Sequence, residues 1–294
     1  MTRNELPETA LSVPNLTFVV IAFNEEARLP NVLKNFHGYG RILVVDNFSA
    51  DATVAIARAR GCEVMLNKND GWVEDYDTME RIKAQVQTEW IYWAMTDEII
   101  SKETLADMAR VIKADTADVI TILRRNYLYG RFCHDIAVSY QTKAFKKSAI
   151  DFQGNTIHNF GRTLAPKERI YQMPSDKFVH HLISNTAASY LDTINRYTNF
   201  EVAGKVAAGL NHSTVYYLLL PLKAIWRDYF CKGGRQAGRP GLILSALMLI
   251  YSLVKAMKGY EATCGLDATA IKSLYQALAD ELLSAFDSDQ KPIN

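Results

Sequence analysis

Two acids, Asp97 and Glu98, follow an apolar stretch at residues 90–95, after the single polar residue Thr96. An apolar run of this length that ends in charge predicts a buried strand of a parallel sheet. Ligands of open α/β sheets bind at the carboxyl ends of the strands, and paired carboxylates there can hold a divalent metal and, through it, a diphosphate. The alternative is a helix N-cap before residues 102–105, where Asp or Ser is favoured. This segment alone leaves both interpretations open.

Polar side chains follow two earlier apolar stretches in the same way. Asn24 and Glu25 follow residues 16–23, and Asp46 follows residues 41–45. Right-handed crossovers between parallel strands would bring these residues to one edge of the sheet with Asp97. Acids and amides at such an edge suit hydrogen bonds to a base and ribose, and metal coordination. No GxGxxG or Walker-type loop occurs in these turns, so neither dinucleotide nor P-loop binding is supported.

The elements that must position these residues alternate between strand and helix. Apolar runs bounded by Gly, Asp or Ser predict strands, and segments of about ten residues between them predict helices. The alternation predicts an α/β fold with a mostly parallel sheet. The expected strands are 16–23, 41–45, 62–66, 90–95 and 118–123, and the expected helices are 30–36, 52–60, 77–87 and 186–208.

Composition limits the class of protein. The chain has 294 residues, of which 49% are hydrophobic, and a formal net charge of +1. This balance excludes nucleic acid as the main partner, because no general basic excess exists. The four cysteines are scattered and predict reduced thiols in a cytoplasmic compartment. Residues 1–14 are polar and predict a tail without a signal peptide. We expect a catalytic domain at 15–209 and a helical region at 210–294.

The helical region contains an apolar and basic part. From Pro221 to Lys258 there are seven Lys or Arg residues and one acid. Its apolar stretches, 215–225 and 241–254, are shorter than the roughly 18 to 20 residues that span a bilayer. We therefore expect residues 215–258 to lie on a membrane surface; the alternatives are a dimer interface and a buried helical hairpin. Residues 266–286 predict an ordinary amphipathic helix.

Three motifs in order resemble one family. They are residues 20–26 (VIAFNEE), 44–53 (VVDNFSADAT) and 96–98 (TDE), which are similar to those of family 2 glycosyltransferases with the GT-A fold. Further motifs around His181, Arg196 and Tyr229 resemble the branch that adds sugars to the lipopolysaccharide inner core. The resemblance, over about residues 16–261, implies a GT-A (Rossmann-like) sheet and transfer, with inversion, from a nucleotide-sugar donor such as a UDP-hexose. It also implies a glycolipid or polysaccharide acceptor and Mg²⁺ or Mn²⁺ as the cofactor. The protein would be cytoplasmic and bound peripherally to the inner face of the cell membrane. A homo-oligomer is compatible with it.

The resemblance assigns the donor contacts. Asn24 and Glu25 match positions that contact the nucleoside, with a helix cap as the alternative. Asp46 matches the acid that meets the uracil base, whose imide N–H a carboxylate can accept. Arg81 lies on the helix before the 90–95 strand, where it reaches the diphosphate unless it simply occupies an exposed helix face. We expect Ser49, with Asp51, to cap the helix that follows.

The metal assignment rests on Asp97 and His158. Asp97 matches the last acid of the family's Asp-x-Asp signature, and His158 matches a histidine near the metal and diphosphate. Met95 stands where the family has its first acid, and a thioether is a poor ligand for a hard cation. Glu98 is a further candidate ligand.

An inverting transfer needs a base that deprotonates the acceptor hydroxyl. The family's glutamate is replaced here by Asn159, which cannot accept a proton at neutral pH. Asp135, Asp151 and Glu168 are the candidate substitutes, and the sequence does not rank them.

Two adjacent pairs of basic residues complete the candidates. We expect His180 and His181 to pack at the start of a helix. Arg124 and Arg125 are candidates for contact with an anionic acceptor.

Two other functions remain open. Met95 and Asn159 favour a family member that has lost catalysis and binds a nucleotide or glycan as a scaffold. A nucleotidyltransferase has a similar sheet, but it would carry a Gly-rich loop after the first strand, which residues 23–26 are not.

Overall fold

The computed structural model describes residues 12–69, 75–132, 138–155, 160–183, 186–207 and 214–287. The chain forms two compact units. The first comprises the chain up to Thr186 together with Tyr229–Ile243, and the second comprises Ala187–Asp228 and the chain from Leu244 onward.

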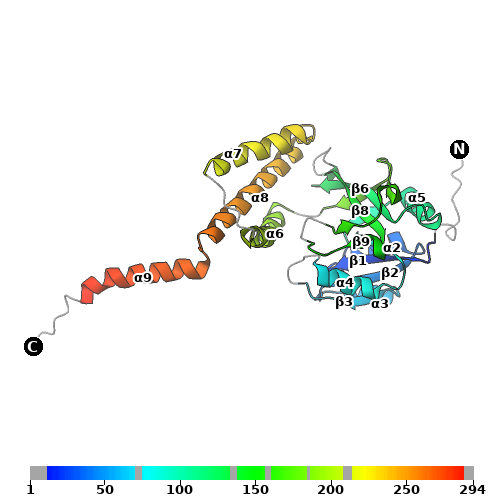
Figure 1. The fold of residues 1–294 in the computed structure, drawn as a ribbon, viewed down its shortest axis with the longest axis horizontal. Helices are drawn as coiled ribbons and strands as arrows, with labels where there is room; N and C mark the ends of the chain where they lie inside the picture. Colours follow the sequence, from blue (N-terminus) through cyan, green and yellow to red (C-terminus); the bar gives the residue numbers. More distant parts are fainter. Residues whose placement is uncertain are drawn as a thin grey trace, which may run out of the picture. The chain divides into compact units, whose positions relative to one another are not determined.

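A mixed, mostly parallel sheet forms the centre of the first unit (Figure 1). Its strands are β1 (Leu16–Ala22), β2 (Arg41–Asp46), β3 (Glu63–Leu66), β4 (Trp90–Met95), β5 (Glu98–Ile100), β6 (Val119–Leu128), β7 (Arg131–Phe132), β8 (Ser139–Lys146), β11 (Ile170–Gln172) and β12 (Phe178–Leu182). The main path runs β3-β2-β1-β4-β8-β6-β12-β5, while β7 and β11 also pair with β6. The strands β9 (Ile150–Asp151) and β10 (Arg162–Thr163) form a separate antiparallel pair.

The predicted α/β fold is confirmed, and so is the common edge. The central strand β1 pairs in parallel with β2 on one side and β4 on the other. In this register Ala22 lies beside Asp46, and Ile21 lies beside Met95. The residues that follow β1, β2 and β4 therefore emerge at the same edge of the sheet.

Helices cover both faces of the sheet, because the central strands are apolar on both sides. On one face Phe18, Phe36 and Tyr92 pack together, with the rings of Phe18 and Phe36 stacked at 4.3 Å. On the other face Trp93 and Phe145 belong to a second core cluster. The helices are α2 (Leu29–Phe36), α3 (Thr53–Ala59), α4 (Tyr76–Gln85) and α5 (Lys102–Lys113), and the short 3₁₀ turns are Lys147–Ala149 and Lys167–Arg169.

The second unit is helical. Glu201 joins two of its helices, since it accepts a hydrogen bond from the Tyr251 hydroxyl and pairs with Lys255 at 3.0 Å. Its elements are α6 (Ala187–Ala207), α7 (Thr214–Ile225), a π-helical turn (Trp226–Cys231), α8 (Arg239–Thr263) and α9 (Ala268–Asp287).

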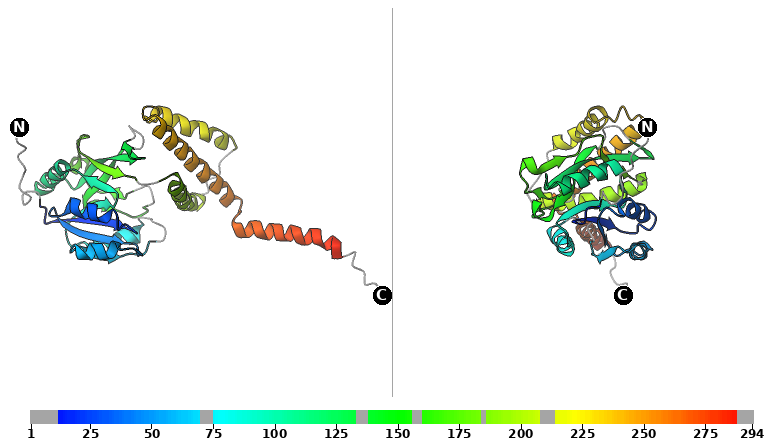
Figure 2. Two further views of the ribbon diagram at one scale, coloured as in Figure 1. Left: turned by 180° about the vertical axis from the view of Figure 1, so that it is seen from behind. Right: turned by 90° about the vertical axis from the view of Figure 1, so that its right-hand side faces the viewer.

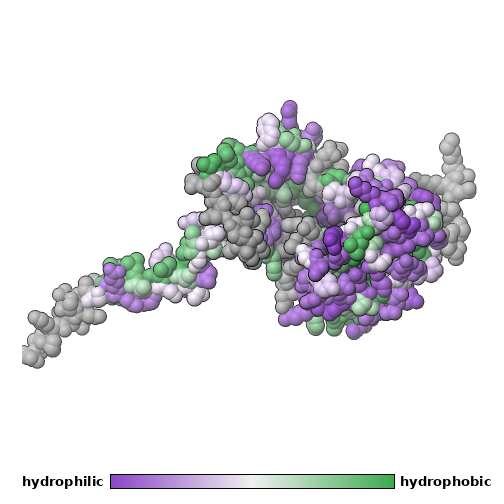
Figure 3. Space-filling model, in the orientation of Figure 1, coloured by the Kyte–Doolittle hydropathy of each residue, from purple (hydrophilic) through white to green (hydrophobic). Residues whose placement is uncertain are grey.

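We expected the second apolar stretch, residues 241–254, to be too short to span a bilayer, and this was wrong by length. The stretch lies within α8, an unbroken helix of 25 residues (Figure 2). Within the described residues α8 is the one helix with the length and composition to cross a membrane, a property that core helices of soluble proteins share. Large apolar side chains are also exposed along α7 and α9, as the green surface over α9 shows in Figure 3.

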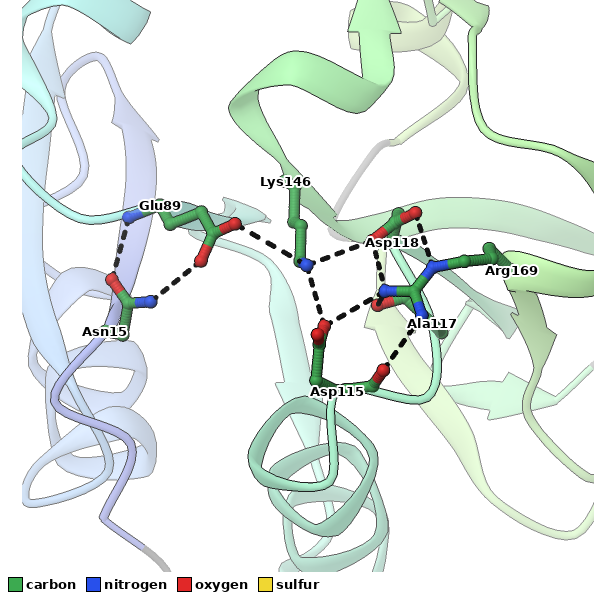
Figure 4. A network of polar contacts seen from close by, with 7 residues as sticks. All are labelled: Asn15, Glu89, Asp115, Ala117, Asp118, Lys146 and Arg169. Carbon is green, nitrogen blue, oxygen red and sulfur yellow. Dashed lines mark hydrogen bonds and ion pairs between the residues drawn. The ribbon is translucent and has the colours of Figure 1, made fainter.

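A charged network closes the opposite edge of the sheet, where β1, β4 and β6 begin (Figure 4). Lys146 lies 2.7 Å from Asp115 and 3.0 Å from Asp118, and Arg169 donates to both carboxylates. The hydrogen bond from Arg169, with further help from Lys146, outweighs desolvation and lowers the pKa of Asp118 to about 2. The acids at this edge are therefore structural.

The network predicts a pH-dependent contribution to stability. Because the folded state favours the charged form of Asp118, its contribution is complete above the ordinary pKa of 3.8 and is lost as the pH falls to about 2. We expect Asp118→Asn to lower the free energy of unfolding at pH 7 by about 1 to 2 kcal/mol, with little difference from wild type at pH 2. Urea unfolding at both pH values measures this, and Asp176→Asn, at an exposed position, is the control. An equal loss at both pH values would contradict the assignment.

Candidate active site

Hydrogen bonds join the loops that follow β1 and β2. The carboxylate of Asp46 is buried and accepts the Ser49 hydroxyl at 2.5 Å and the Ser49 amide at 2.8 Å. The Ser49 oxygen in turn accepts the amide of Asn24 at 2.8 Å, and the Asn24 side chain accepts the amide of Ala50. Ser49 therefore bridges the two loops and is not the helix cap that we expected. Asn24 and Asp46 remain candidates for nucleoside contacts.

The backbone at this edge is left-handed at two points, a conformation that asparagine tolerates and that costs more at a bulky residue such as Phe48. Asn24 has φ 53° and Phe48 has φ 60°, values in the left-handed region that residues other than glycine rarely adopt. The hydrogen bonds of Ser49 lie between these two residues and hold both loops in place. Phe48 is 56% exposed, so no burial of its own ring explains the strained conformation.

Asp97 meets His181 at the end of β4. The Asp97 Oδ2 lies 3.2 Å from His181 Nε2, and the amide of Leu182 donates to the Asp97 carbonyl at 2.7 Å. His181 lies in β12, directly opposite Glu98 in the antiparallel pairing of β5 and β12. The expectation that His180 and His181 pack at a helix start was therefore wrong. The helix-cap alternative for the two acids is also excluded, because Ser101 caps α5.

Asn126 orients the imidazole of His181. Its Oδ1 lies 2.6 Å from Nδ1 and accepts the proton there, so Nε2 is the ring nitrogen that faces the carboxylate of Asp97. Two lone pairs 3.2 Å apart require a proton or a cation between them. A carboxylate oxygen and an imidazole nitrogen are also suitable ligands for Mn²⁺. The pair therefore fits a divalent metal, although the described residues contain no group of three His, Cys, Asp or Glu that could hold one.

The surrounding cations keep Asp97 ionised. Burial favours the neutral form of this carboxyl group, but the hydrogen bond and charge of His181, with the charges of Arg28 and Arg124, hold its pKa below the usual range. Arg28 NH1 lies 3.9 Å from Asp97 Oδ2. Glu25 forms hydrogen bonds with Arg28, one of them from Nε at 2.6 Å, and so fixes its guanidinium beside Asp97.

Neither Met95, in the position of the family's first acid, nor Glu98, directly after Asp97, is a second metal ligand. Met95 packs against the core cluster on the other face of the sheet. Glu98 is 1% exposed and its carboxylate pairs with Lys143 at 2.5 Å. Lys143 reaches Glu98 because it is the extra residue of a β-bulge, between Thr142, which pairs with Thr121, and Ala144.

The other predicted residues are placed as follows. Arg81 donates to Asn67 at 3.0 Å, just beyond the end of β3 and at the same edge as Asp46. Asp151 pairs with Arg162 at 2.8 Å and accepts the amide of Gln153, and these contacts lower its pKa. No contact between Asp151 and Asp97 is seen among the described residues.

Two predicted residues, Asp135 and His158, lie outside the described residues. The predictions missed His181, Arg28, Asn126 and Lys143. The available signal for His181 was that Phe178 and Val179, residue types that favour strands, directly precede the two histidines.

The family model for glycosyl transferase family 2 matches residues 17–166, about half of the chain. The match includes Asn24, Asp46 and Asp97, the residues at the carboxyl edge of the sheet. The chain belongs to glycosyl transferase family 2. Because the match ends at residue 166, it does not include His181.

Known glycosyltransferases are similar to this family 2 chain in sequence or in fold. Over 112 residues it is 30% identical to the SPbeta prophage-derived glycosyltransferase SunS of Bacillus subtilis, a match that covers 36% of this chain and 26% of SunS. The chain thus spans about a quarter of the length of this curated relative. Among solved structures, S. aureus TarS 1-349 with UDP-GlcNAc has a TM-score of 0.43 at 15% identity, covering 86% of this chain and 93% of that one. The mannosyltransferase PcManGT of Pyrobaculum calidifontis with GDP-Man and Mn²⁺ has a TM-score of 0.42 at 14% identity, covering 90% and 80%.

The bridge formed by Ser49 predicts a clear effect on stability. Ser49→Ala removes one hydrogen bond from the buried Asp46 and one from the amide of Asn24. We expect a loss of about 1 to 3 kcal/mol in the free energy of unfolding. Thermal and urea unfolding measure the loss, with Ser139→Ala, at an exposed position, as the control. Equal stabilities of the two variants would show that the bridge does not hold the loops.

Proposed function

We propose that the protein transfers a hexose, with inversion, from a UDP-sugar to a glycolipid or polysaccharide acceptor. The observation that carries this proposal is the Asp97–His181 pair, which lies at the same edge of the sheet as Asp46 and Asn24. The pair supplies a diphosphate site, and the polar loops beside it supply a nucleoside site. Family membership supports the reaction class.

In this proposal each residue has a defined part. Asp46 accepts the imide N–H of uracil, and Asn24 with Glu25 borders the nucleoside. Asp97 and His181 would hold Mg²⁺ or Mn²⁺, which when bound supplies positive charge for the diphosphate leaving group. His158 would be a further ligand, and Arg81 would approach the diphosphate from the end of β3.

The acceptor hydroxyl attacks the anomeric carbon as the bond to the diphosphate breaks, and a base takes the hydroxyl proton. Asp151 is the weaker candidate, because the hydrogen bond from the Gln153 amide and the pairing with Arg162 lower its pKa. Glu168 lies in the 3₁₀ turn Lys167–Arg169 before β11, at the opposite edge of the sheet from Asp97. We therefore propose Asp135 as the base.

The second candidate function is a nucleotide- or glycan-binding scaffold. Met95, which stands in place of an acid, favours it because the pair of Asp97 and His181 is then a smaller ligand set.

We also propose that residues 215–258 bind the inner surface of the cell membrane. Exposed Leu219, Leu222 and Trp226 support this, as does the excess of Lys and Arg, which anionic headgroups attract. A membrane-borne acceptor of the kind used in lipopolysaccharide inner-core synthesis is consistent with this location.

The donor proposal is tested by calorimetry and turnover. With Mn²⁺, we expect UDP to bind at least about tenfold more tightly than GDP or CDP. Asp97→Asn should lower the hydrolysis or transfer rate with UDP-hexoses by roughly 100-fold or more, since it removes an ionised group that would hold the divalent metal needed by the leaving diphosphate. Asp176→Asn is the matched control. Absence of UDP binding would refute the donor class, and UDP binding without Asp97-dependent turnover would favour the scaffold.

The membrane proposal is tested by sedimentation with anionic vesicles. We expect a double substitution, Leu219→Glu with Leu222→Glu, to reduce the bound fraction by at least about tenfold, because charge replaces apolar area at the surface. Leu274→Glu on α9, where the leucine is 60% exposed, is the control outside residues 215–258. Equal binding by both variants would contradict the proposal.

A further inference from the structure

Arg124 lies on the same face of the sheet as the Asp97–His181 pair. Side chains alternate along a strand, so Arg124 and Asn126 in β6 share one face, and Asn126 binds His181 on that face. The charge of Arg124 also acts on Asp97. Its side chain is 29% exposed, which leaves the guanidinium largely enclosed but open to a ligand.

The contacts of Arg124 leave its donors unused. Its NH1 lies 3.6 Å from Glu98 Oε1, which is within ion-pair range but too long for a hydrogen bond. That oxygen is buried and has no hydrogen-bond partner. Within the described residues, the guanidinium of Arg124 makes no side-chain hydrogen bond. A largely enclosed guanidinium with five N–H donors is costly unless an acceptor arrives.

The charge of Glu98 does not require Arg124. Lys143 already pairs with Glu98 Oε2 at 2.5 Å, and both side chains are buried. Arg28, the other arginine near Asp97, is engaged by Glu25. Arg124 therefore lies beside Asp97 with N–H donors that an incoming anion can use. The planar fork of a guanidinium matches the oxygens of a phosphoryl group.

We propose that Arg124 binds a phosphoryl oxygen of the donor's diphosphate. This inference rests on the proposed function. It separates Arg124 from Arg125, whose side chain is on the opposite face. Arg125 donates to the Ser175 carbonyl at 3.3 Å and stacks over Phe178, with 4.2 Å from its guanidinium carbon to the ring centroid.

The test compares UDP with uridine, which has the base and ribose but no phosphate. Binding to wild type, Arg124→Met and Arg124→Lys is measured without an acceptor and in EDTA, which removes divalent metal ions. Arg125→Met is the control. We expect Arg124→Met to weaken UDP binding by roughly 10- to 100-fold while uridine binding changes less than about twofold. Arg124→Lys keeps a charge beside Glu98, so it should fold even if the Met variant does not, and its loss of UDP affinity should be smaller.

Three outcomes would overturn the inference. They are an equal loss of UDP and uridine binding, unchanged UDP affinity in both Arg124 variants, and an Arg125→Met variant that loses UDP affinity as strongly. If wild type binds neither UDP nor uridine, in EDTA or with Mn²⁺, the proposed donor class fails, and the inference fails with it. If wild type binds UDP and the Arg124 variants bind it equally well, only the inference fails.

Discussion

The pairing of β5 with β12 determines the candidate active site. This antiparallel contact sets His181 opposite Glu98 and brings the imidazole within 3.2 Å of Asp97, a residue 84 positions earlier in the chain. The same pairing lets the Leu182 amide bind the Asp97 carbonyl, so the turn after β4 has a single orientation. Without it, Asp97 would remain at the edge of the sheet with no imidazole partner.

Charge balance explains why acids can be concentrated beside this contact. Glu98 is buried, which would be very costly without Lys143, and Lys143 reaches it only through the β-bulge in β8. Asp97 is kept ionised by cations from three separate elements. The site thus combines a buried, neutralised carboxylate with a second carboxylate that is available for chemistry. Only the second one faces a ligand in the proposed reaction.

The sequence predicted the parallel half of the site well. Apolar runs and polar endings located Asn24, Asp46 and Asp97, because strand, crossover helix and strand are local patterns with a known handedness. His181 and Lys143 were not predicted in their roles, since a distant strand pairing and a bulge are decided by tertiary packing. The length of α8 was underestimated because a helix continues through the more polar residues 255–263, once its apolar part is formed.

A structure of the protein soaked with UDP and Mn²⁺ would show directly whether the Asp97–His181 pair binds the donor. We expect uracil beside Asp46 and the diphosphate at the Asp97–His181 pair, with Asp97 and His181 both turned toward the ligand. A nucleotide bound elsewhere, with Asp97 and His181 still contacting only each other and the protein, would contradict it.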